Sequence, residues 1–456
     1  MFDIAIIGAG PGGYISAIRA SQLGASVVLI EKDNVGGTCL NWGCIPSKSV
    51  ICSAEKYNSA KNLKKFGILA ENISFDYLEI DSRKWNTVTK IRKSLELLLK
   101  SHKIEIIKGN ATIKDNHTVI IENEQTQEIN FKHLIIATGA KPSEIKGLKY
   151  DHEFIVDSSD ILKLNQLPES VLIVGSGAIG IEWARIFDSF GSRVAITELA
   201  PRLSPQSDIS VSERLERIFK RKRVEFYTNT TISSIEGKTV KLSNDKELNP
   251  DLIFVAAGRK ADLTQIGLEN ISIETEKGFI KVDNNLKTNI DNIYAIGDIT
   301  GKMQLAHCAS HQGVCAVENI LLGKEGHIDY NCIPAVIYGS PEVASVGMTE
   351  QQLQDSNTEY KSSIFPMSAI GKSVVDDEIE GFVKILSTDN KIVGAHIIGA
   401  EASSLIQSLT VAIHNKISPN SLKETVFAHP TYSEAIHESI LGLDNLSLHL
   451  PPQKAK

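Results

Sequence analysis

Two cysteines five residues apart, Cys39 and Cys44, stand in the segment GGTCLNWGCIPSK at residues 36–48. Thiols at this spacing serve as a structural bridge, metal ligands, a redox pair or inert buried side chains. A zinc site needs two more clustered ligands, and the other cysteines lack CxxC or HxxxH spacing. A bridge across so short a loop contributes about 2 kcal/mol in the chain-entropy model. Redox chemistry therefore explains the pair better than the alternatives do.

The surroundings of the pair favour the thiolate, which is the form that exchanges disulfides. We predict that a helix begins at the pair, and the dipole at a helix start lowers the pKa of a thiol. Lys48 follows Cys44 by four residues, so it lies on the same helical face one turn further on. In a reducing compartment such a pair is catalytic or metal-binding more often than structural.

The residues before the cysteines read as strand, glycine turn, helix and strand. In DIAIIGAGPGGYISAIRASQLGASVVLIEK, residues 3–32, an apolar run precedes Gly8, Gly10 and Gly13, and a second run ends at Glu31. Glycines let the backbone approach a pyrophosphate at a helix N-terminus, and the closing acid accepts hydrogen bonds from a ribose. The alternative is a glycine turn that only packs the helix on the strand.

The same pattern recurs in SVLIVGSGAIGIEWARIFDSFGSRVAITEL, residues 170–199. Its glycines are Gly175, Gly177 and Gly180, and Glu198 follows Gly175 by 23 residues, the spacing that also separates the glycine and the acid of the first unit. The repeat predicts two dinucleotide-binding units of the doubly wound type.

The acid of the second unit bears on the choice of nucleotide. A carboxylate near the ribose 2′ position suits a free hydroxyl and repels a 2′-phosphate, so Glu198 favours NAD over NADP. Arg193 and Arg202 lie close enough in sequence to weaken that preference.

Three further strands end in glycine: HLIIATGAKP at 133–142, LIFVAAGRKAD at 252–262 and NIYAIGDIT at 292–300. Each is expected to emerge at the carboxyl edge of a sheet, where ligands bind in open α/β folds. In the last of these, Asp298 is predicted either to bond a ribose or polyol, or to cap the segment that follows.

The composition fits a protein of about three domains at ~150 residues each. The chain has 456 residues, 42% of them apolar, and a net charge of −7. It has no basic block longer than KRKR at 220–223 and no apolar run of ~18 residues, so we expect neither a nucleic acid nor a membrane as partner. The strand pattern starting at Asp3 leaves no room for a signal sequence, which predicts a cytoplasmic protein.

The last part of the chain, residues 330–456, mixes strand-like and helix-like runs and has no glycine fingerprint. We expect an α+β domain without a cofactor of its own. The predicted class is thus α/β, with two doubly wound Rossmann-like dinucleotide-binding domains and a C-terminal α+β domain.

Several motifs together resemble the flavoprotein disulfide reductases over essentially the whole chain. They are the cysteine segment, the paired fingerprints, ATG at 137–139, AIGD at 295–298, LAH at 305–307 and HPTYSE at 429–434. Within that family, CLN.GCIPSK, GAHIIGAEA and HPTYSEA are most similar to the members that oxidise dihydrolipoamide. Glutathione reductases tend to differ in the cysteine segment, and mercuric reductases carry a C-terminal cysteine pair.

The resemblance implies FAD in the first unit, NAD in the second and a homodimer. It implies an FAD domain at 1–145 that resumes at 265–329, an NAD domain at 146–264 and a dimerisation domain at 330–456. The implied activity is oxidation of dihydrolipoamide on lipoyl carrier domains of 2-oxo acid dehydrogenase or glycine cleavage complexes. The alternatives are another NAD(P)H-dependent disulfide reductase or diaphorase, and a chain that mainly docks in a multienzyme complex.

The resemblance also implies residue roles. Cys39 would meet the substrate dithiol, Cys44 would be the charge-transfer thiol against the flavin, and Lys48 would lie near the flavin N5 and pair with Glu182. His429 would be the acid/base.

Glu434 would orient His429, and in this family that pair comes from the partner subunit. The sequence is compatible with this role because Pro430 can open a helix on which Glu434 lies early. A neighbouring carboxylate would raise the histidine pKa and fix its tautomer. The alternative is a histidine that only satisfies a helix start.

No metal is expected. The cofactor-binding residues that the fingerprints and the resemblance imply are Gly8, Gly10, Gly13, Glu31, Lys32, Gly37, Thr38, Lys48, Ala111, Ala137, Thr138, Gly139, Gly175, Gly177, Ile179, Gly180, Glu182, Glu198, Gly258, Asp298, Leu305, Ala306 and His307.

Three places in the chain depart from the family pattern: CASHQG at 308–313, Trp42 and SAIGKS at 368–373. Cys308 and His311 stand where relatives commonly show charged residues, Trp42 replaces a small aliphatic residue between the cysteines, and SAIGKS at 368–373 replaces a more arginine-bearing segment. Trp42 is the departure expected to alter access to the disulfide.

Overall fold

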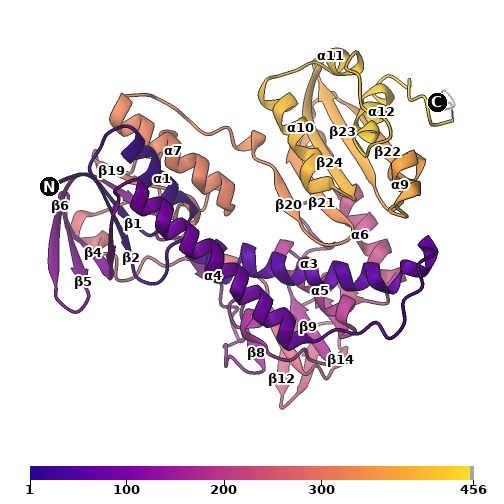
Figure 1. Cartoon of the computed structure of the whole chain (residues 1–456), viewed down its shortest axis with the longest axis horizontal. Coiled ribbons are helices and arrows are strands. Elements are labelled where there is room, and N and C mark those ends of the chain that lie inside the picture. Colours follow the sequence, from indigo (N-terminus) through magenta and orange to yellow (C-terminus); the bar gives the residue numbers. More distant parts are fainter. Residues whose placement is uncertain (452–456) are drawn as a thin grey trace.

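The computed structural model describes residues 1–451 and builds them around three large sheets of seven, five and five strands (Figure 1). Two of these sheets have parallel cores with helices packed on them, and the third is antiparallel. The predicted class, two doubly wound α/β units and an α+β unit, is therefore confirmed.

The first sheet has the strand order β3-β2-β1-β6-β5-β4, and β19 also pairs with β6. Strands β1, β2, β3, β6 and β19 run parallel, whereas β4, β5 and the first half of β6 form an antiparallel meander. The inner strands are runs of apolar residues because both of their faces are buried, one under helices that include α1 (Pro11–Gln22) and α7 (Ala306–Leu322) and the other under β4, β5 and residues 266–282. The strands are β1 (Phe2–Ile7), β2 (Val27–Glu31), β3 (Glu105–Lys108), β4 (Asn110–Asp115), β5 (Thr118–Glu122), β6 (Gln127–Ile136) and β19 (Ile293–Ala295).

Helices α1 and α7 lie side by side on the first sheet (Figure 1). Glycines permit the close contact, because a Cβ on Gly313 would lie 2.7 Å from the carbonyl oxygen of Gly12. This packing brings the start of α7, late in the chain, to the first glycine turn.

The second sheet repeats the parallel arrangement, with the order β11-β10-β9-β15-β8. Helices α5 (Ala178–Phe190) and α6 (Ile209–Arg221) belong to this unit, and a small antiparallel sheet of β12, β13 and β14 follows β11 in the chain. The strands are β8 (Ile155–Val156), β9 (Ser170–Val174), β10 (Arg193–Thr197), β11 (Glu225–Tyr227), β12 (Ile232–Glu236), β13 (Thr239–Leu242), β14 (Glu247–Leu248) and β15 (Leu252–Val255).

The second unit is an insertion in the first. The chain leaves the first sheet through β7 (Ala140–Pro142) and comes back through β16 (Arg259–Ala261), and these two strands pair antiparallel. Strand β19 then joins the first sheet beside β6. A first domain that resumes after the second was expected from the resemblance, and the boundary residues proposed for it stay predictions.

The third sheet has the order β20-β21-β24-β23-β22 and is antiparallel throughout. Its strands are β20 (Ala335–Ile337), β21 (Glu342–Gly347), β22 (Lys361–Pro366), β23 (Phe382–Thr388) and β24 (Lys391–Gly399). Its helices are α8 (Glu350–Asp355), α9 (Gly371–Val375), α10 (Ala402–His414), α11 (Pro419–Lys423) and α12 (Glu434–Gly442).

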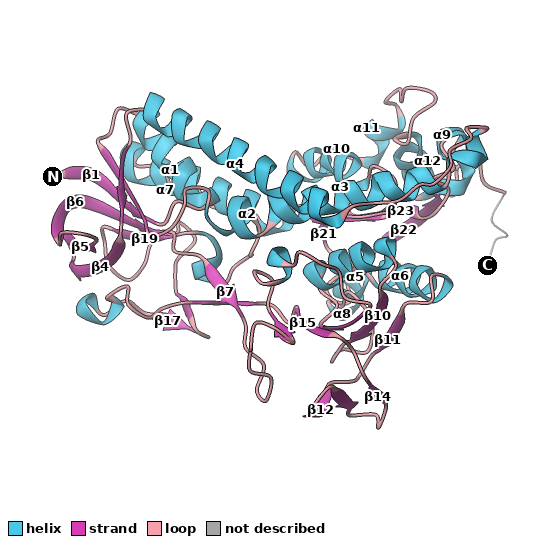
Figure 2. Ribbon diagram, turned by 60° about the horizontal axis from the view of Figure 1, so that its bottom comes forward, coloured by secondary structure: helices cyan, strands magenta, loops and turns pink. Residues whose placement is uncertain are grey.

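The three units share a core. Val50 of helix α3 (Cys44–Lys61), Ile173 of β9 and Ile398 of β24 are buried in one hydrophobic cluster. A buried ion pair adds to this contact, since Lys384 Nζ lies 2.6 Å from Asp208 Oδ1 at the start of α6. Figure 2 shows α3 and the longer α4 (Tyr77–Ser101) extending from the first sheet toward the third.

The remaining elements are short. They are β17 (Thr275–Glu276), β18 (Phe279–Ile280) and the 3-10 helices η1 (Leu63–Phe66), η2 (Ile161–Lys163), η3 (Leu268–Ile271), η4 (Gly297–Thr300), η5 (Tyr330–Cys332) and η6 (Met367–Ala369). Among residues 1–451, no helix combines the length and the apolar character needed to cross a membrane.

Candidate active site

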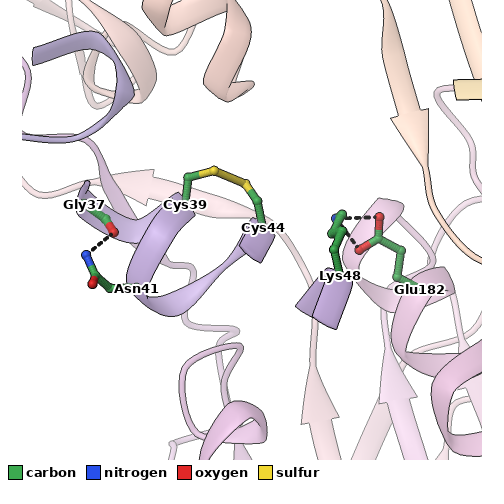
Figure 3. The surroundings of a disulfide bond; sticks show 6 residues. All are labelled: Gly37, Cys39, Asn41, Cys44, Lys48 and Glu182. Atoms are coloured by element: carbon green, nitrogen blue, oxygen red, sulfur yellow. Dashed lines mark hydrogen bonds and ion pairs between the residues drawn. A yellow bond between two sulfur atoms is a disulfide. The ribbon is translucent and has the colours of Figure 1, made fainter. Parts of the chain in front are cut away.

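The two cysteines of the opening motif form a disulfide (Figure 3). Cys39 lies in the short helix α2 (Gly37–Trp42), Cys44 is the first residue of α3, and their Cα atoms are 4.6 Å apart. Gly43 makes the tight junction possible, because a Cβ there would lie 3.0 Å from the carbonyl oxygen of Thr38. The bond excludes inert free thiols and metal ligation in this state, and leaves a redox pair or a staple.

Among residues 1–451, the two cysteines belong to no group of three or more potential metal ligands. Within the described part of the chain, the group of side chains that could share a metal ion is His152, Asp157 and Asp160, and it includes no cysteine.

Helix α2 is held by hydrogen bonds to the residues just before it and by a contact with α4. The buried Asn41 amide donates hydrogen bonds of 3.0 Å to the carbonyl oxygens of Val35 and Gly37. Trp42 packs edge-on against Trp85 of α4 with 5.6 Å between ring centroids, and its Nε1 donates to Asp33 at 3.2 Å. The indole that departs from the family pattern therefore ties α2 to α4.

Lys48 lies one turn beyond Cys44 and pairs with Glu182 of α5 (Figure 3). Its Nζ is 2.9 Å from both carboxylate oxygens. The Glu182 side chain is 5% exposed, so the ion pair is shielded on its acidic side. This expected pairing is present, and it joins the cysteine-bearing helix to the helix that follows the second glycine turn.

The first glycine loop, residues 8–13, closes on the strand beside it. Gly8 has φ +99°, and a Cβ there would lie 2.4 Å from the carbonyl oxygen of Ala137. A Cβ on Gly13 would lie 1.8 Å from the carbonyl oxygen of Gly8. Helix α1 begins without a side-chain cap, which leaves the N–H groups of its first turn for an anion. Glu31 Oε2 accepts a 2.7 Å hydrogen bond from the Ala9 N–H, so the acid lies beside the loop.

The start of α2 lies over the first glycine loop. Gly37 has φ +56°, and a Cβ on it would lie 2.6 Å from Gly10 Cα. The Gly36 N–H donates to the Ala9 carbonyl oxygen at 2.7 Å. The segment that carries the disulfide is thus in contact with the predicted pyrophosphate site.

Two polar groups beside the first glycine loop lack a protein partner. The Thr138 hydroxyl is buried and makes no hydrogen bond with the described residues. Asp298 accepts none through its carboxylate either, and burial raises its pKa although the charge of Arg259 opposes this. A ligand rich in hydroxyl or N–H groups would satisfy both.

The capping alternative for Asp298 is wrong. Asp298 lies inside the first turn of η4, and neither η4 nor α7 has a side-chain cap. The physical reason is that η4 begins at Gly297, which places Asp298 past the position from which a side chain reaches the free N–H groups.

The second glycine loop, residues 175–180, has the same internal geometry. Gly175 has φ +101°, and a Cβ there would lie 2.7 Å from the carbonyl oxygen of Ala256. A Cβ on Gly180 would lie 2.1 Å from the carbonyl oxygen of Gly175. Helix α5 also begins without a side-chain cap. A Cβ on Gly177, however, would meet nothing within 4 Å, so this loop is open.

Glu198 is held more firmly than its counterpart in the first unit. Ser176 donates to Glu198 Oε2 from its N–H at 2.8 Å and from its hydroxyl at 2.6 Å. Arg202 is engaged elsewhere, with its Nη1 donating to the carbonyl oxygen of Ser207 at 2.7 Å. Arg193 begins β10, at the opposite end of that strand from Glu198. Neither arginine is placed to offset the carboxylate.

The geometry agrees with what the chain matches among known proteins. Residues 2–313 match the family model described as pyridine nucleotide-disulphide oxidoreductase, and residues 333–440 match the dimerisation domain of the same family. The chain belongs to the pyridine nucleotide-disulphide oxidoreductase family. The resemblance drawn from the motifs is confirmed.

Relatives of similar length exist within this oxidoreductase family. The chain is 40% identical over 461 residues to the dihydrolipoyl dehydrogenase of Chlamydia trachomatis, with 99% of each chain covered. It is 37% identical over 476 residues to a dihydrolipoyl dehydrogenase of Bacillus subtilis, covering 98% of this chain and 99% of that one.

Solved structures share the fold. LpdA of Mycobacterium tuberculosis superposes with a TM-score of 0.91 at 24% identity, covering 97% of this chain and 100% of that one. The HOCl-induced flavoprotein disulfide reductase RclA of Escherichia coli gives 0.85 at 27% identity, covering 96% and 99%.

Pyridine nucleotide-disulphide oxidoreductases use FAD and NAD, and both glycine loops fit such groups. Each loop offers close backbone approach, an uncapped helix start and a carboxylate, as a dinucleotide requires. The first loop additionally has the unpaired Thr138 and Asp298.

The other predicted cofactor residues are distributed around the two loops, and their roles stay predictions. Gly139 (φ +75°) follows β6, Gly258 (φ +98°) follows β15, Ile179 lies in α5, Lys32 and Thr38 are exposed, and Leu305, Ala306 and His307 begin α7. Ala111 differs from the rest because its methyl group lies in the hydrophobic core under the first sheet. Only its backbone is available to a cofactor.

His429 and Glu434 contact each other, with 2.9 Å between Nδ1 and Oε1. The His429 side chain is 75% exposed. Figure 2 shows α12, which begins at Glu434, well apart from α2, which carries Cys39. The expectation that Pro430 opens the helix is wrong. Helix α12 begins at Glu434, because Oε2 of Glu434 accepts from the Thr431 N–H and holds the preceding residues in a turn.

Cys308, another departure from the family pattern, is not a second redox thiol. It is fully buried in α7, and burial together with the charge of Asp298 raises its pKa to about 11. The thiol stays protonated near neutral pH and is inert. His311 is exposed on the same helix.

Two contributors escaped the sequence analysis. Ser176 lies between the first two glycines of the second fingerprint. A hydroxyl residue at that position predicts a hydrogen bond to the acid that closes the fingerprint. Tyr338 contacts Glu182 across 156 residues of sequence, and no local pattern marks such a contact.

Proposed function

We propose that the protein oxidises dihydrolipoyl groups to lipoyl groups, with the Cys39–Cys44 disulfide as first electron acceptor and NAD as the last. The observation that carries the proposal is the disulfide at the junction of α2 and α3, directly beside the first glycine loop. The full-length similarity to dihydrolipoyl dehydrogenases supports the choice of substrate.

The two cofactors divide between the loops. Residues 1–145 and 265–329 would hold FAD, and residues 146–264 would hold NAD. When bound, FAD takes an electron pair from the thiols and supplies a hydride to NAD. Glu31 and Asp298 would bind hydroxyl groups of the first nucleotide, and Glu198 would bind the ribose of the second. Lys48, oriented by Glu182, would supply a positive charge near the flavin N5.

The thiol chemistry is an exchange between two dithiols. His429 takes a proton from one substrate thiol, the thiolate attacks Cys39 Sγ, and the bond to Cys44 breaks, so that Cys44 leaves as a thiolate. The second substrate thiol then attacks the mixed disulfide and displaces Cys39. The substrate thus loses two electrons and the cysteine pair gains them. Glu434 accepts from Nδ1–H of His429, which leaves Nε2 as the base.

A homodimer completes this site. His429 is exposed in the third unit, and α12, which begins at its partner Glu434, lies apart from α2 (Figure 2), so the base would reach a disulfide on a second copy. The match to a dimerisation domain over residues 333–440 supports this arrangement. The substrates are lipoyl carrier domains of 2-oxo acid dehydrogenase or glycine cleavage complexes in the cytoplasm.

The test is steady-state turnover of the purified protein with two substrate pairs. Dihydrolipoamide with NAD should react faster than glutathione disulfide with NADPH. Faster turnover of the second pair would instead assign the chain to another disulfide reductase. A protein that cannot be reconstituted with FAD would favour a docking role.

A variant separates thiol chemistry from nucleotide chemistry. Cys39→Ser should keep bound flavin and NADH-to-dye activity while losing dihydrolipoamide oxidation. Retained dihydrolipoamide oxidation would remove Cys39 from the mechanism.

A further inference from the structure

A third side chain contacts the Lys48–Glu182 ion pair. Tyr338 lies between β20 and β21 of the third sheet. Its N–H donates to Glu182 Oε1 at 3.1 Å, and Lys48 Nζ lies 4.5 Å from the centroid of its ring. The quadrupole of an aromatic ring attracts a cation over its face. Tyr338 of the third unit therefore contacts both members of an ion pair in which Lys48 comes from the first unit and Glu182 from the second.

Arg185 fixes the path of this loop. It lies in α5, is 5% exposed, and its Nη1 donates to the carbonyl oxygen of Tyr338 at 3.0 Å. Gly339 has φ +112°, and a Cβ there would lie 2.7 Å from Arg185 Cδ. Burial lowers the pKa of Arg185 to about 10 while neighbouring glutamates oppose the shift, so the guanidinium stays charged near neutral pH. The backbone of Tyr338 is thus held by a buried arginine on one side and a buried carboxylate on the other.

The ring of Tyr338, rather than its hydroxyl, makes the contact. Within residues 1–451 the hydroxyl has no hydrogen-bond partner, and burial raises its pKa, so it is neutral. Phenylalanine at this position would keep the ring and both backbone bonds. Leucine would keep the backbone bonds and remove the aromatic face.

We propose that Tyr338 is a positioning residue for Lys48, and that through it the third unit fixes the ammonium group at the redox centre. The proposal rests on the proposed function in one respect, the position of Lys48 beside the flavin. The contact itself does not depend on any cofactor.

The first test needs no cofactor. Brief reductive methylation followed by peptide mass spectrometry measures how fast Lys48 reacts, with exposed Lys32 as internal reference. Tyr338→Leu should make Lys48 react about fivefold faster, the factor that corresponds to the loss of one cation–π contact. Tyr338→Phe should restore the wild-type rate. Tyr338→Met serves if the leucine variant does not fold. An unchanged Lys48 rate in folded Leu or Met variants would overturn the proposal.

The second test measures the flavin midpoint potential of the reconstituted protein. A positive charge nearby stabilises the reduced, more negative flavin, so Tyr338→Leu should shift the potential to a more negative value, and Lys48→Met should shift it in the same direction. The double variant should match Lys48→Met alone. Fully additive shifts would show that Tyr338 acts independently of Lys48. Failure of wild-type protein to bind FAD or oxidise dihydrolipoamide would refute the proposed function, and the methylation rates would still decide the role of Tyr338.

Discussion

The two glycine loops have the same internal contacts but differ in the segments that lie next to them. In each, the first glycine approaches the carbonyl of the residue after a neighbouring strand, and the third approaches the carbonyl of the first. In each, the closing glutamate accepts a hydrogen bond from the residue between the first two glycines. The shared features are those that a pyrophosphate and a ribose require.

The two loops differ in whether another segment lies over them, and we call the segment over the first loop, the start of α2, its cover. The first glycine loop lies under the start of α2, where Gly37 and Gly10 are in contact, whereas nothing stands within 4 Å of a Cβ on Gly177. A ligand under a cover leaves only when the cover moves, and here that cover carries Cys39. The first loop is thus suited to a resident cofactor next to the disulfide, and the second to a nucleotide that exchanges in each turnover.

The largest effect is expected where the cover touches the loop. Gly37→Ala puts a Cβ 2.6 Å from Gly10 Cα on a residue with φ +56°. Overpacking and left-handed strain together should weaken FAD binding by about 100-fold. Fluorescence titration of the flavin-free protein measures this affinity. Gly67→Ala is the matched control, since Gly67 has φ +75° but nothing within 4 Å. Equal losses in both variants would show that strain, rather than the cover, matters.

The corresponding change in the open loop should spare the fold. Gly177→Ala introduces a Cβ that has no protein atom within 4 Å apart from its chain neighbours. The second glycine of such a fingerprint lets the backbone approach the pyrophosphate, so the added methyl group should obstruct the nucleotide. We expect unchanged flavin content and thermal stability, and a KM for NAD raised about tenfold. Steady-state kinetics at varied NAD measure the effect. Loss of flavin in this variant would contradict the independence of the two loops.

The design of the loops was predictable because it is local. The interval from Gly8 to Glu31 recurs from Gly175 to Glu198, and both intervals lie within one strand-helix-strand unit. The contact between His429 and Glu434 spans five residues and is local for the same reason. Local patterns predict helix boundaries less well: Pro430 was expected to open a helix, but α12 begins four residues later, at Glu434.

The cover and the contacts between units were not predictable from spacing. Lys48 and Glu182 are 134 residues apart and were paired through a family resemblance, not through periodicity. The contact of Tyr338 with Glu182 spans 156 residues, and that of Lys384 with Asp208 spans 176. Such contacts depend on how whole sheets pack together, and a single sequence carries no periodic signal for that.

A smaller effect should distinguish the two closing acids. Ser176→Ala makes the second loop resemble the first, where Ala9 stands at the same position, and it removes one of the three hydrogen bonds that Glu198 accepts. The preference for NAD over NADP, measured as the ratio of kcat/KM values, should fall about fivefold. Ala9→Ser is the reciprocal control and should leave this ratio unchanged. An unaltered preference in Ser176→Ala would mean that the backbone N–H groups of Ser176 and Ala200 suffice to orient Glu198.

The smallest effect concerns pH and belongs to the first loop alone. Burial raises the pKa of Asp298, and the charge of Arg259 opposes the shift only in part. In the flavin-free protein, Asp298 therefore binds a proton at pH values above 3.8, the ordinary pKa of this carboxyl group. A flavin hydroxyl can donate to the carboxylate only after that proton has left, so protonation of Asp298 opposes FAD binding. FAD affinity should be constant at higher pH and decline, by about threefold at first, as pH falls into the range just above that value. Fluorescence titrations at a series of pH values measure the decline. Asp298→Asn should bind FAD more weakly but lose this pH dependence, because it has no carboxylate to protonate. The same decline in the asparagine variant would assign the titration to another group of the first unit.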